Sequence, residues 1–256
     1  DPNGCDYDFY NITVNEPDVI SATHNTVDVI CNGDPTGSAN TLTVSGGVGG
    51  AGPYSYAWTN DNNPSVVVSV DEDPFETLYA GDYTCTITDP NGCDYDFYNI
   101  TVNEPDPLTV SATWTDITCN GDGNGTVTAI VVGGVIPYVY AWTDANSNLV
   151  SGGNVAYVTG LQAGTYTCTV TDAGGCIVIE TVTVFEPSIP LTINPTSITN
   201  VVCNGQSNGG ATVFPTGGVP GYLYSWTGPW PSTTVISSTN NIVNQTAGIY
   251  ICNVTD

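Results

Sequence analysis

Nine cysteines are the residues of this chain whose type and spacing are most informative about chemistry. No two of them stand in the Cys-Xaa-Xaa-Cys spacing typical of zinc sites, and the chain has one histidine, His24. Metal ligation by cysteine and histidine is therefore not expected. Disulfide bonds formed in an oxidising compartment are the better interpretation. The cysteines fall into three sets by sequence context: Cys31, Cys119 and Cys203; Cys85, Cys168 and Cys252; Cys5, Cys93 and Cys176.

Catalytic chemistry has little support in the sequence. His24 stands in Thr-His-Asn-Thr, and no Gly-Xaa-Ser-Xaa-Gly motif supplies a nucleophile for it. Residue type alone leaves a glycosidase built from two carboxylates open. An active site nevertheless has no reason to accompany three near-copies of a spacer domain. We therefore predict that the chain is not an enzyme and that it needs no cofactor.

One segment resembles part of a calcium loop. Asn120-Gly-Asp-Gly-Asn-Gly125 offers oxygen ligands, with Asp122 as the central carboxylate. The downstream glutamate of an EF-hand is missing, and the corresponding segments after Cys31 and Cys203 do not keep the carboxylates. The pattern favours a turn over a metal site.

The charge balance excludes two classes of partner. The chain has no lysine or arginine and 25 aspartates and glutamates, for a formal net charge of −25. It therefore lacks the basic residues needed to meet nucleic-acid phosphates or an anionic membrane surface. No apolar run is long enough to span a bilayer, and the first residues are not a signal peptide. We expect a mature or internal segment of an extracellular or cell-surface protein.

Three copies of one unit are visible in the sequence. The Cys-Asn-Gly cysteines are 88 and 84 residues apart, and three tryptophans that end similar aromatic strands are 84 and 84 apart. A unit of this length can bury its own core, so each copy is predicted to be a domain. The tryptophans, expected in the three cores, are Trp58, Trp142 and Trp226.

The local pattern predicts an all-β fold. Short runs alternate between apolar and polar residues, are separated by Gly, Pro, Asn and Asp, and show no helical period. A tyrosine stands two residues before a cysteine in every copy, as in the tyrosine corner of immunoglobulin-like sandwiches. We predict three tandem immunoglobulin-like β-sandwich domains, arranged head-to-tail. Their limits are 18–105, 106–187 and 188–256.

The segment Asp1–Asp18 recurs unchanged at Asp89–Asp106. In the second position it is predicted to include the last strand of the first domain. We therefore expect residues 1–17 to complete the third domain of an adjoining unit, because domain 188–256 lacks the corresponding strand. The partner is another copy of the chain, either a separate molecule or the next period of one long polypeptide.

The combined motifs resemble the SprB-type repeat. They are Cys-Asn-Gly, Gly-Gly-Val, Pro-Tyr-Xaa-Tyr-Ala-Trp, Leu-Xaa-Ala-Gly-Xaa-Tyr-Thr, Thr-Asp and Gly-Cys, in this order and clearest between Cys119 and Pro187. The resemblance implies secreted or surface-displayed repeat proteins of Bacteroidota, including gliding adhesins, with tandem immunoglobulin-like modules. It implies no catalytic residues.

The same resemblance implies a disulfide pairing. Cys31 would bond Cys93, Cys119 would bond Cys176, and Cys203 would need Cys5 from an adjoining unit. Cys85 and Cys168 would then be buried free thiols. The residues themselves also leave open the rival pair Cys31–Cys85, which would link the two sheets of a sandwich.

The surface offers two further kinds of candidate site. Sequons for N-linked glycans are one, with Ser/Thr-linked glycans as an equal alternative. Two tryptophans outside the repeat pattern, Trp114 and Trp230, are the other, because an exposed indole can stack on a sugar ring. We predict a structural unit of an extracellular filament or long surface fibre, with a carbohydrate-binding adhesin module as the alternative. The five sequons begin at Asn11, Asn99, Asn124, Asn244 and Asn253.

Overall fold

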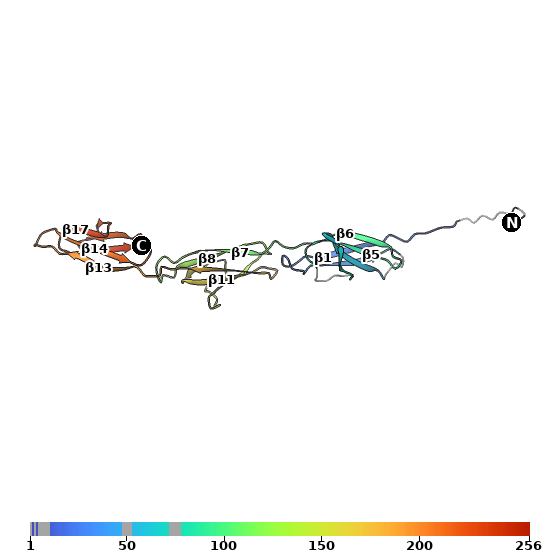
Figure 1. Ribbon diagram of the computed structural model, residues 1–256, viewed down its shortest axis with the longest axis horizontal. Coiled ribbons are helices and arrows are strands. Elements are labelled where there is room, and N and C mark those ends of the chain that lie inside the picture. The colour runs from blue at the N-terminus through green and yellow to red at the C-terminus, as the bar shows by residue number, and fades with distance from the viewer. Residues whose placement is uncertain (1, 3, 5–10, 48–52, 72–77) are drawn as a thin grey trace. The chain divides into compact units, whose positions relative to one another are not determined.

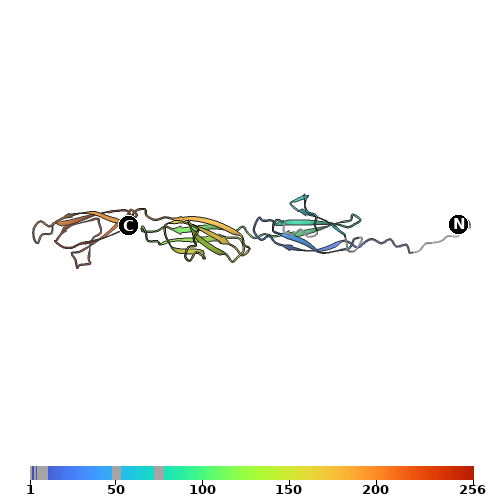
Figure 2. The same cartoon turned by 90° about the horizontal axis from the view of Figure 1, so that it is seen from below.

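The described part of the chain is all β, as predicted. The computed structural model describes residues 2, 4, 11–47, 53–71 and 78–256, which form eighteen strands. In this part of the chain no helix has the length and apolar character needed to cross a membrane. Figures 1 and 2 show the strands of each repeat in two layers, and this immunoglobulin-like arrangement confirms the predicted fold class.

The first repeat contains a two-stranded sheet, β1-β2, and a four-stranded sheet in the order β4-β3-β5-β6, both antiparallel. The last strand, β6, lies at the edge of its sheet and pairs only with β5 among the described strands. The strands are β1 (Ser21–Val27), β2 (Ser38–Ser45), β3 (Ser55–Asn60), β4 (Asn63–Ser69), β5 (Gly81–Thr88) and β6 (Asp94–Val102).

The second repeat has two antiparallel sheets of three strands, in the orders β10-β8-β7 and β12-β11-β9. Its last strand, β12, pairs with β11 as β6 pairs with β5. The strands are β7 (Thr109–Thr115), β8 (Gly125–Val132), β9 (Val139–Asp144), β10 (Tyr157–Leu161), β11 (Gly164–Thr171) and β12 (Ile177–Val184).

The third repeat follows the same plan with the orders β13-β14-β17 and β16-β15-β18. Among the described residues, no strand corresponds to β6 or β12 here, so β18 pairs only with β15. The strands are β13 (Thr192–Thr199), β14 (Gly209–Thr216), β15 (Leu223–Thr227), β16 (Val235–Ser237), β17 (Asn241–Gln245) and β18 (Ile251–Thr255).

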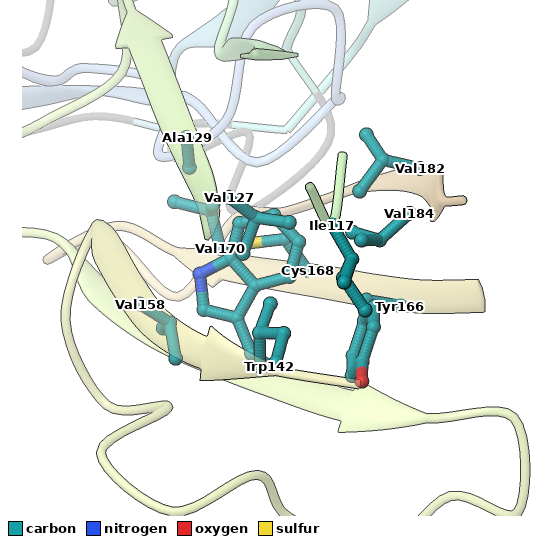
Figure 3. Close-up of a cluster of buried hydrophobic side chains, with 11 residues drawn as sticks. Ile117, Val127, Ala129, Trp142, Val158, Tyr166, Cys168, Val170, Val182 and Val184 are labelled. Atoms are coloured by element: carbon teal, nitrogen blue, oxygen red, sulfur yellow. The ribbon is translucent and has the colours of Figure 1, made fainter. Parts of the chain in front are cut away.

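Alternating side chains build each core. In β5, Tyr83, Cys85 and Ile87 are buried while the threonines between them are not, because successive side chains of a strand point to opposite faces. The equivalent residues of β11 surround Trp142 in Figure 3. The predicted core position of the three repeat tryptophans is confirmed, since at most 3% of each side chain is exposed.

The tyrosine corner is also confirmed. The hydroxyl of Tyr83 donates a hydrogen bond to the carbonyl of Tyr79 at 2.9 Å, and Tyr166 makes the same bond to Gln162 at 2.9 Å. In the third repeat, Tyr250 donates to the carbonyl of Thr246 at 3.0 Å. This bond fixes the loop that leads into the cysteine-bearing strand in all three repeats.

The chain divides into two compact units, which do not coincide with single repeats. The first contains 1–109 together with the short segments 132–137 and 172–176, and the second contains 110–131, 138–171 and 177–256. The domain limits drawn from the sequence stay predictions.

Candidate functional site

The open edge of the third repeat is the feature that sets it apart from the other two. Tyr83 and Tyr166 are 2% and 8% exposed, whereas the equivalent Tyr250 is only half-buried. Likewise Cys85 and Cys168 are fully buried, whereas Cys252 is half-buried. The cysteines lie on β5, β11 and β18; among the described strands, β5 and β11 have a partner on both sides, whereas β18, which begins directly after Tyr250, has one on one side only.

A groove of about 490 Å³ lies in the third repeat, within the second compact unit. Apolar groups line much of it, including the core residues Trp226 and Ile242 and the ring of Tyr250. Gly209, at the start of β14 in the other sheet, and Val201, in the loop before β14, also line the groove. The groove therefore reaches from the edge of the sandwich to its core.

Three equivalent glycines show what fills this space in the other repeats. A Cβ at Gly37 would lie 2.5 Å from Cγ1 of Val102 in β6, and one at Gly125 would lie 2.6 Å from Cγ1 of Val184 in β12. A Cβ at Gly209 would meet no such valine; its nearest neighbours are the carbonyl oxygen of Gln245 and Cγ2 of Val201. A last-strand valine therefore occupies the position that is open in the third repeat.

The two copies of the duplicated sequence differ in burial and in secondary structure. In β6, Ile100 and Val102 are 0% and 1% exposed. Their exact counterparts, Ile12 and Val14, lie in a segment without a strand and are 79% and 92% exposed. Most of the predicted strand 1–17 precedes residue 11 and lies outside the described residues, apart from residues 2 and 4.

In the first two repeats, the Cys-Asn-Gly turn binds the Glu-Pro segment through which the chain leaves the repeat. In the first repeat, the side-chain amide of Asn32 donates to the carbonyl of Pro105 at 3.1 Å, and the N–H of Gly33 donates to the Glu104 carboxylate at 2.6 Å. In the second, the amide of Asn120 donates to the carbonyl of Pro187 at 2.7 Å. The N–H of Gly121 donates to the carboxylate of Glu186 at 2.8 Å.

The disulfide found in the described residues corrects the expected pairing. Cys31 is bonded to Cys176, with their Cα atoms 5.7 Å apart, and not to Cys93 or Cys85. Cys93, Cys119 and Cys203 are exposed thiols, so the expected Cys119–Cys176 pair is wrong too. Cys5, the expected partner of Cys203, lies outside the described residues.

The physical reason is that Cys31 and Cys93 lie at opposite ends of the first repeat. The turn of Cys31 holds Pro105, where the chain leaves the repeat, and Cys93 lines a groove of about 240 Å³ with Glu16 and Pro17, where the chain enters it.

The other cysteines behave as core residues. Burial, with a smaller contribution from Asp96, raises the pKa of the Cys85 thiol to about 12, and burial raises that of Cys168 to about 11. Burial also raises the pKa of Cys252, against a backbone hydrogen bond from Ser225 that lowers it. A thiol with a raised pKa is a poor nucleophile and metal ligand at neutral pH, which fits a packing role.

The surface candidates are all accessible. Trp114, on β7, is 47% exposed, and Trp230 is 67% exposed, with its backbone N–H bonded to the carbonyl of Ile249. All five sequon asparagines are exposed. Asp122 is exposed in a turn closed by its own N–H and the carbonyl of Cys119, and no group of three metal-binding side chains gathers in the described part of the chain.

His24 lies on β1, with its ring against an aromatic residue of β6. Its ring packs edge-on against Phe97, with the centroids 5.2 Å apart. No sequence motif links these two residues, since the contact depends on the spatial proximity of β1 and β6.

Comparison with known families finds the SprB repeat three times in this chain, at residues 23–63, 111–147 and 196–229. Each match begins in the first strand of a repeat and covers its Cys-Asn-Gly turn. No curated protein matches the chain.

Comparison with solved structures finds several tandem-domain proteins. The N-terminal eight Ig domains of DSCAM isoform 1.30.30 share 12% identity over 94% of this chain and 43% of theirs, with a TM-score of 0.41. The chain thus spans less than half the length of that structure. Dpr2 Ig1–Ig2 in complex with DIP-Theta Ig1–Ig3 gives 13% identity over 93% and 95%, with a TM-score of 0.31. A tetra-tandem repeat in the extending region of a large adhesion protein gives 14% identity over 93% and 75%, with a TM-score of 0.26.

Proposed function

We propose that this chain, in which the SprB repeat is found three times, is a non-catalytic structural unit of an extracellular filament or long cell-surface fibre. The family match supports the coarser statement, a repeat region of a surface adhesin. The finer statement is that copies join head-to-tail, with residues 1–17 of one copy completing the third repeat of another. The open groove along residues 245–250, which lead into β18, is the observation that carries it.

The groove and the duplicated sequence match in register. In β5-β6, Gly81 lies opposite Val102 and Tyr83 opposite Ile100. The equivalents of Gly81 and Tyr83 in the third repeat are Gly248 and Tyr250, which both line the groove. By the same register, Val14 of an adjoining copy lies opposite Gly248 and Ile12 opposite Tyr250.

The energetic argument is hydrophobic burial together with backbone pairing. Ile12 and Val14 expose most of their surface, and burying each is favourable by about 1.5–3 kcal/mol. Strand addition also pairs the free edge of β18, which otherwise leaves backbone groups without strand partners. Both gains come from one movement, the insertion of the segment beside β18.

A second contact follows from the Cys-Asn-Gly turns. Asn204 and Gly205 stand where Asn32-Gly33 and Asn120-Gly121 hold a proline carbonyl and a glutamate. The sequence that follows the added strand supplies the same two residues, Glu16 and Pro17. The turn of the third repeat therefore clamps the entry segment of the adjoining copy.

The test is assembly of the reduced chain, measured by light scattering and negative-stain electron microscopy. We expect filaments, and Val14→Asp should weaken assembly by about 100-fold or more, because it places a carboxylate in an apolar groove. Thr13→Asp is the matched control, since its equivalent Thr101 is exposed and faces the other side of the strand. Equal assembly by both variants would exclude strand addition.

Intact mass of the native, reduced and denatured material then separates two forms of the proposal. A mass near 26.6 kDa indicates separate copies, and a single giant species indicates successive periods of one polypeptide.

A second candidate function is carbohydrate binding by an adhesin module. The exposure of Trp114 and Trp230 favours it, because an accessible indole can stack on a sugar. Glycan-array binding that disappears with Trp114→Ala or Trp230→Ala would support it. Glycans attached to the five sequon asparagines would be found by peptide mapping.

A further inference from the structure

The Cys31–Cys176 bond joins consecutive repeats. Cys31 lies in the Cys-Asn-Gly turn of the first repeat, and Cys176 lies in the turn between β11 and β12 of the second. Both residues belong to the first compact unit, and the sulfur of Cys176 lies 3.5 Å from the carbonyl oxygen of Ile30. The rule it suggests is that a Cys-Asn-Gly cysteine bonds the turn cysteine of the repeat that follows.

The donor half of this junction has the same form in the third repeat. The carbonyl of Cys31 accepts a hydrogen bond from the N–H of Asp34 at 3.1 Å, and the carbonyl of Cys203 accepts one from Gln206 at 3.1 Å. The glycine two residues after each cysteine has φ near +80°, at 82° and 83°. Cys203 is an exposed thiol on a turn that already has the shape of the bonded one.

The receiving half has the same form in the first repeat. The N–H of Cys176 donates to Asp172 Oδ1 at 2.9 Å, and the N–H of Cys93 donates to Asp89 Oδ1 at 2.9 Å. In both turns the carbonyl of the cysteine accepts the N–H of that aspartate at 3.0 Å. Cys93 is therefore an exposed thiol held in the same turn as the bonded Cys176.

The two thiols meet if copies join head-to-tail, so this inference rests on the proposed function. The turn of Cys203 would then clamp Glu16 and Pro17 of the next copy. In that copy, Glu16, Pro17 and Cys93 line one groove. The contact that holds the entry segment thus places Cys203 beside Cys93.

We propose that Cys203 of one copy and Cys93 of the next form an interchain disulfide equivalent to Cys31–Cys176. By the same rule, the sequence assigns Cys119 to Cys5 of the next copy, a residue that lies outside the described part of the chain. Every exposed cysteine of the described residues then has a partner, and each junction between repeats carries one covalent bond.

Formation of the bond requires a disulfide as oxidant, of the small-molecule or protein dithiol class. The Cys203 thiolate attacks this disulfide, which forms a mixed disulfide and releases one thiolate of the oxidant. The Cys93 thiolate then attacks the sulfur of Cys203 and displaces the second thiolate. Two cysteine thiols are oxidised, the oxidant is reduced to two thiols, and two protons pass from the cysteines to the released thiolates.

The test uses filaments assembled from an equal mixture of ¹⁴N and ¹⁵N chains under oxidising conditions. After alkylation of the free thiols, the filaments are digested without reduction. The proteases cut at aspartate, glutamate or aromatic residues, because the chain has no lysine or arginine. We expect a Cys93–Cys203 peptide in which half of the pairs are isotopically mixed. Cys203→Ser should make Cys93 alkylatable in the filament.

The outcomes separate this proposal from the one it rests on. Filaments in which Cys93 and Cys203 are alkylated, or are bonded to other cysteines, overturn the disulfide and leave strand addition standing. A Cys93–Cys203 peptide that is never isotopically mixed overturns the interchain bond. Absence of any filament, reduced or oxidised, overturns both proposals.

Discussion

Ile100 and Val102 are fully buried, whereas Ile12 and Val14, in an identical sequence of eighteen residues, are exposed. The local sequence is the same, so its β-propensity cannot explain the difference. What differs is the neighbour: β6 has the edge of β5 beside it, and residues 11–14 have no strand partner in the described chain. A strand of this kind is specified by the surface that it completes, and the third repeat offers a second such surface.

The largest expected effect is that of an aspartate in place of Val102, the buried counterpart of Val14. Val102→Asp should destabilise the first repeat by about 4 kcal/mol or more, because it buries an unpaired carboxylate in the core. Val14→Asp should change the unfolding free energy of the unassembled chain by less than about 0.5 kcal/mol. Urea unfolding followed by tryptophan fluorescence measures both. A similar loss in the two variants would mean that Val14 is already buried within its own copy.

The next prediction supplies the missing strand in the same chain. Extending the chain beyond Asp256 with the sequence of residues 2–18 should stabilise the third repeat by about 2 kcal/mol, after the ordering of the added segment offsets part of the burial. Hydrogen exchange of the β18 amides should slow by about 30-fold. The control extension carries aspartate at the positions that correspond to Ile12 and Val14. Equal protection by both extensions would show that the groove does not select these side chains.

The sequence was sufficient for the features that depend on local pattern. Alternation in β5 and β11 predicted the inward tyrosine and cysteine, and the repeat spacing predicted the three core tryptophans. It was insufficient for the disulfide, because no local pattern encodes which cysteines of successive repeats come together. The bond depends on which ends of successive repeats meet, and this is a property of the junction, not of the strand pattern.

The reactivity of the thiols tests how accessible the equivalent cysteines Cys85, Cys168 and Cys252 are in the three repeats. In the reduced Val14→Asp chain at pH 8, iodoacetamide should modify the exposed thiols first, then Cys252, and last Cys168 and Cys85. A pKa near 11 or 12 instead of 9.0 lowers the thiolate population at this pH by about 10²-fold for Cys168 and 10³-fold for Cys85. Mass spectrometry over time gives the rates. Cys252 should approach the rate of Cys168 in the extended chain, and an unchanged rate there would contradict strand addition.

The last comparison concerns the glycines that face the last strand. Gly125→Ala should destabilise the second repeat by about 1–3 kcal/mol, because its Cβ would lie 2.6 Å from Val184 and 3.0 Å from the carbonyl oxygen of Leu161. Gly209→Ala should cost less in the unassembled chain, since the nearest atoms lie at 3.0 Å or more.

In the assembled form, by contrast, Gly209→Ala should be unfavourable. Once Val14 of another copy lies in the groove, the methyl group of Gly209→Ala occupies the place that the valine needs, so the variant should assemble more weakly than the parent chain. Light scattering of the two chains across a concentration series measures the shift. If Gly209→Ala assembles as well as the parent, the valine does not enter the groove in the register of β6, and the equivalence between residues 11–14 and 99–102 fails at its closest contact.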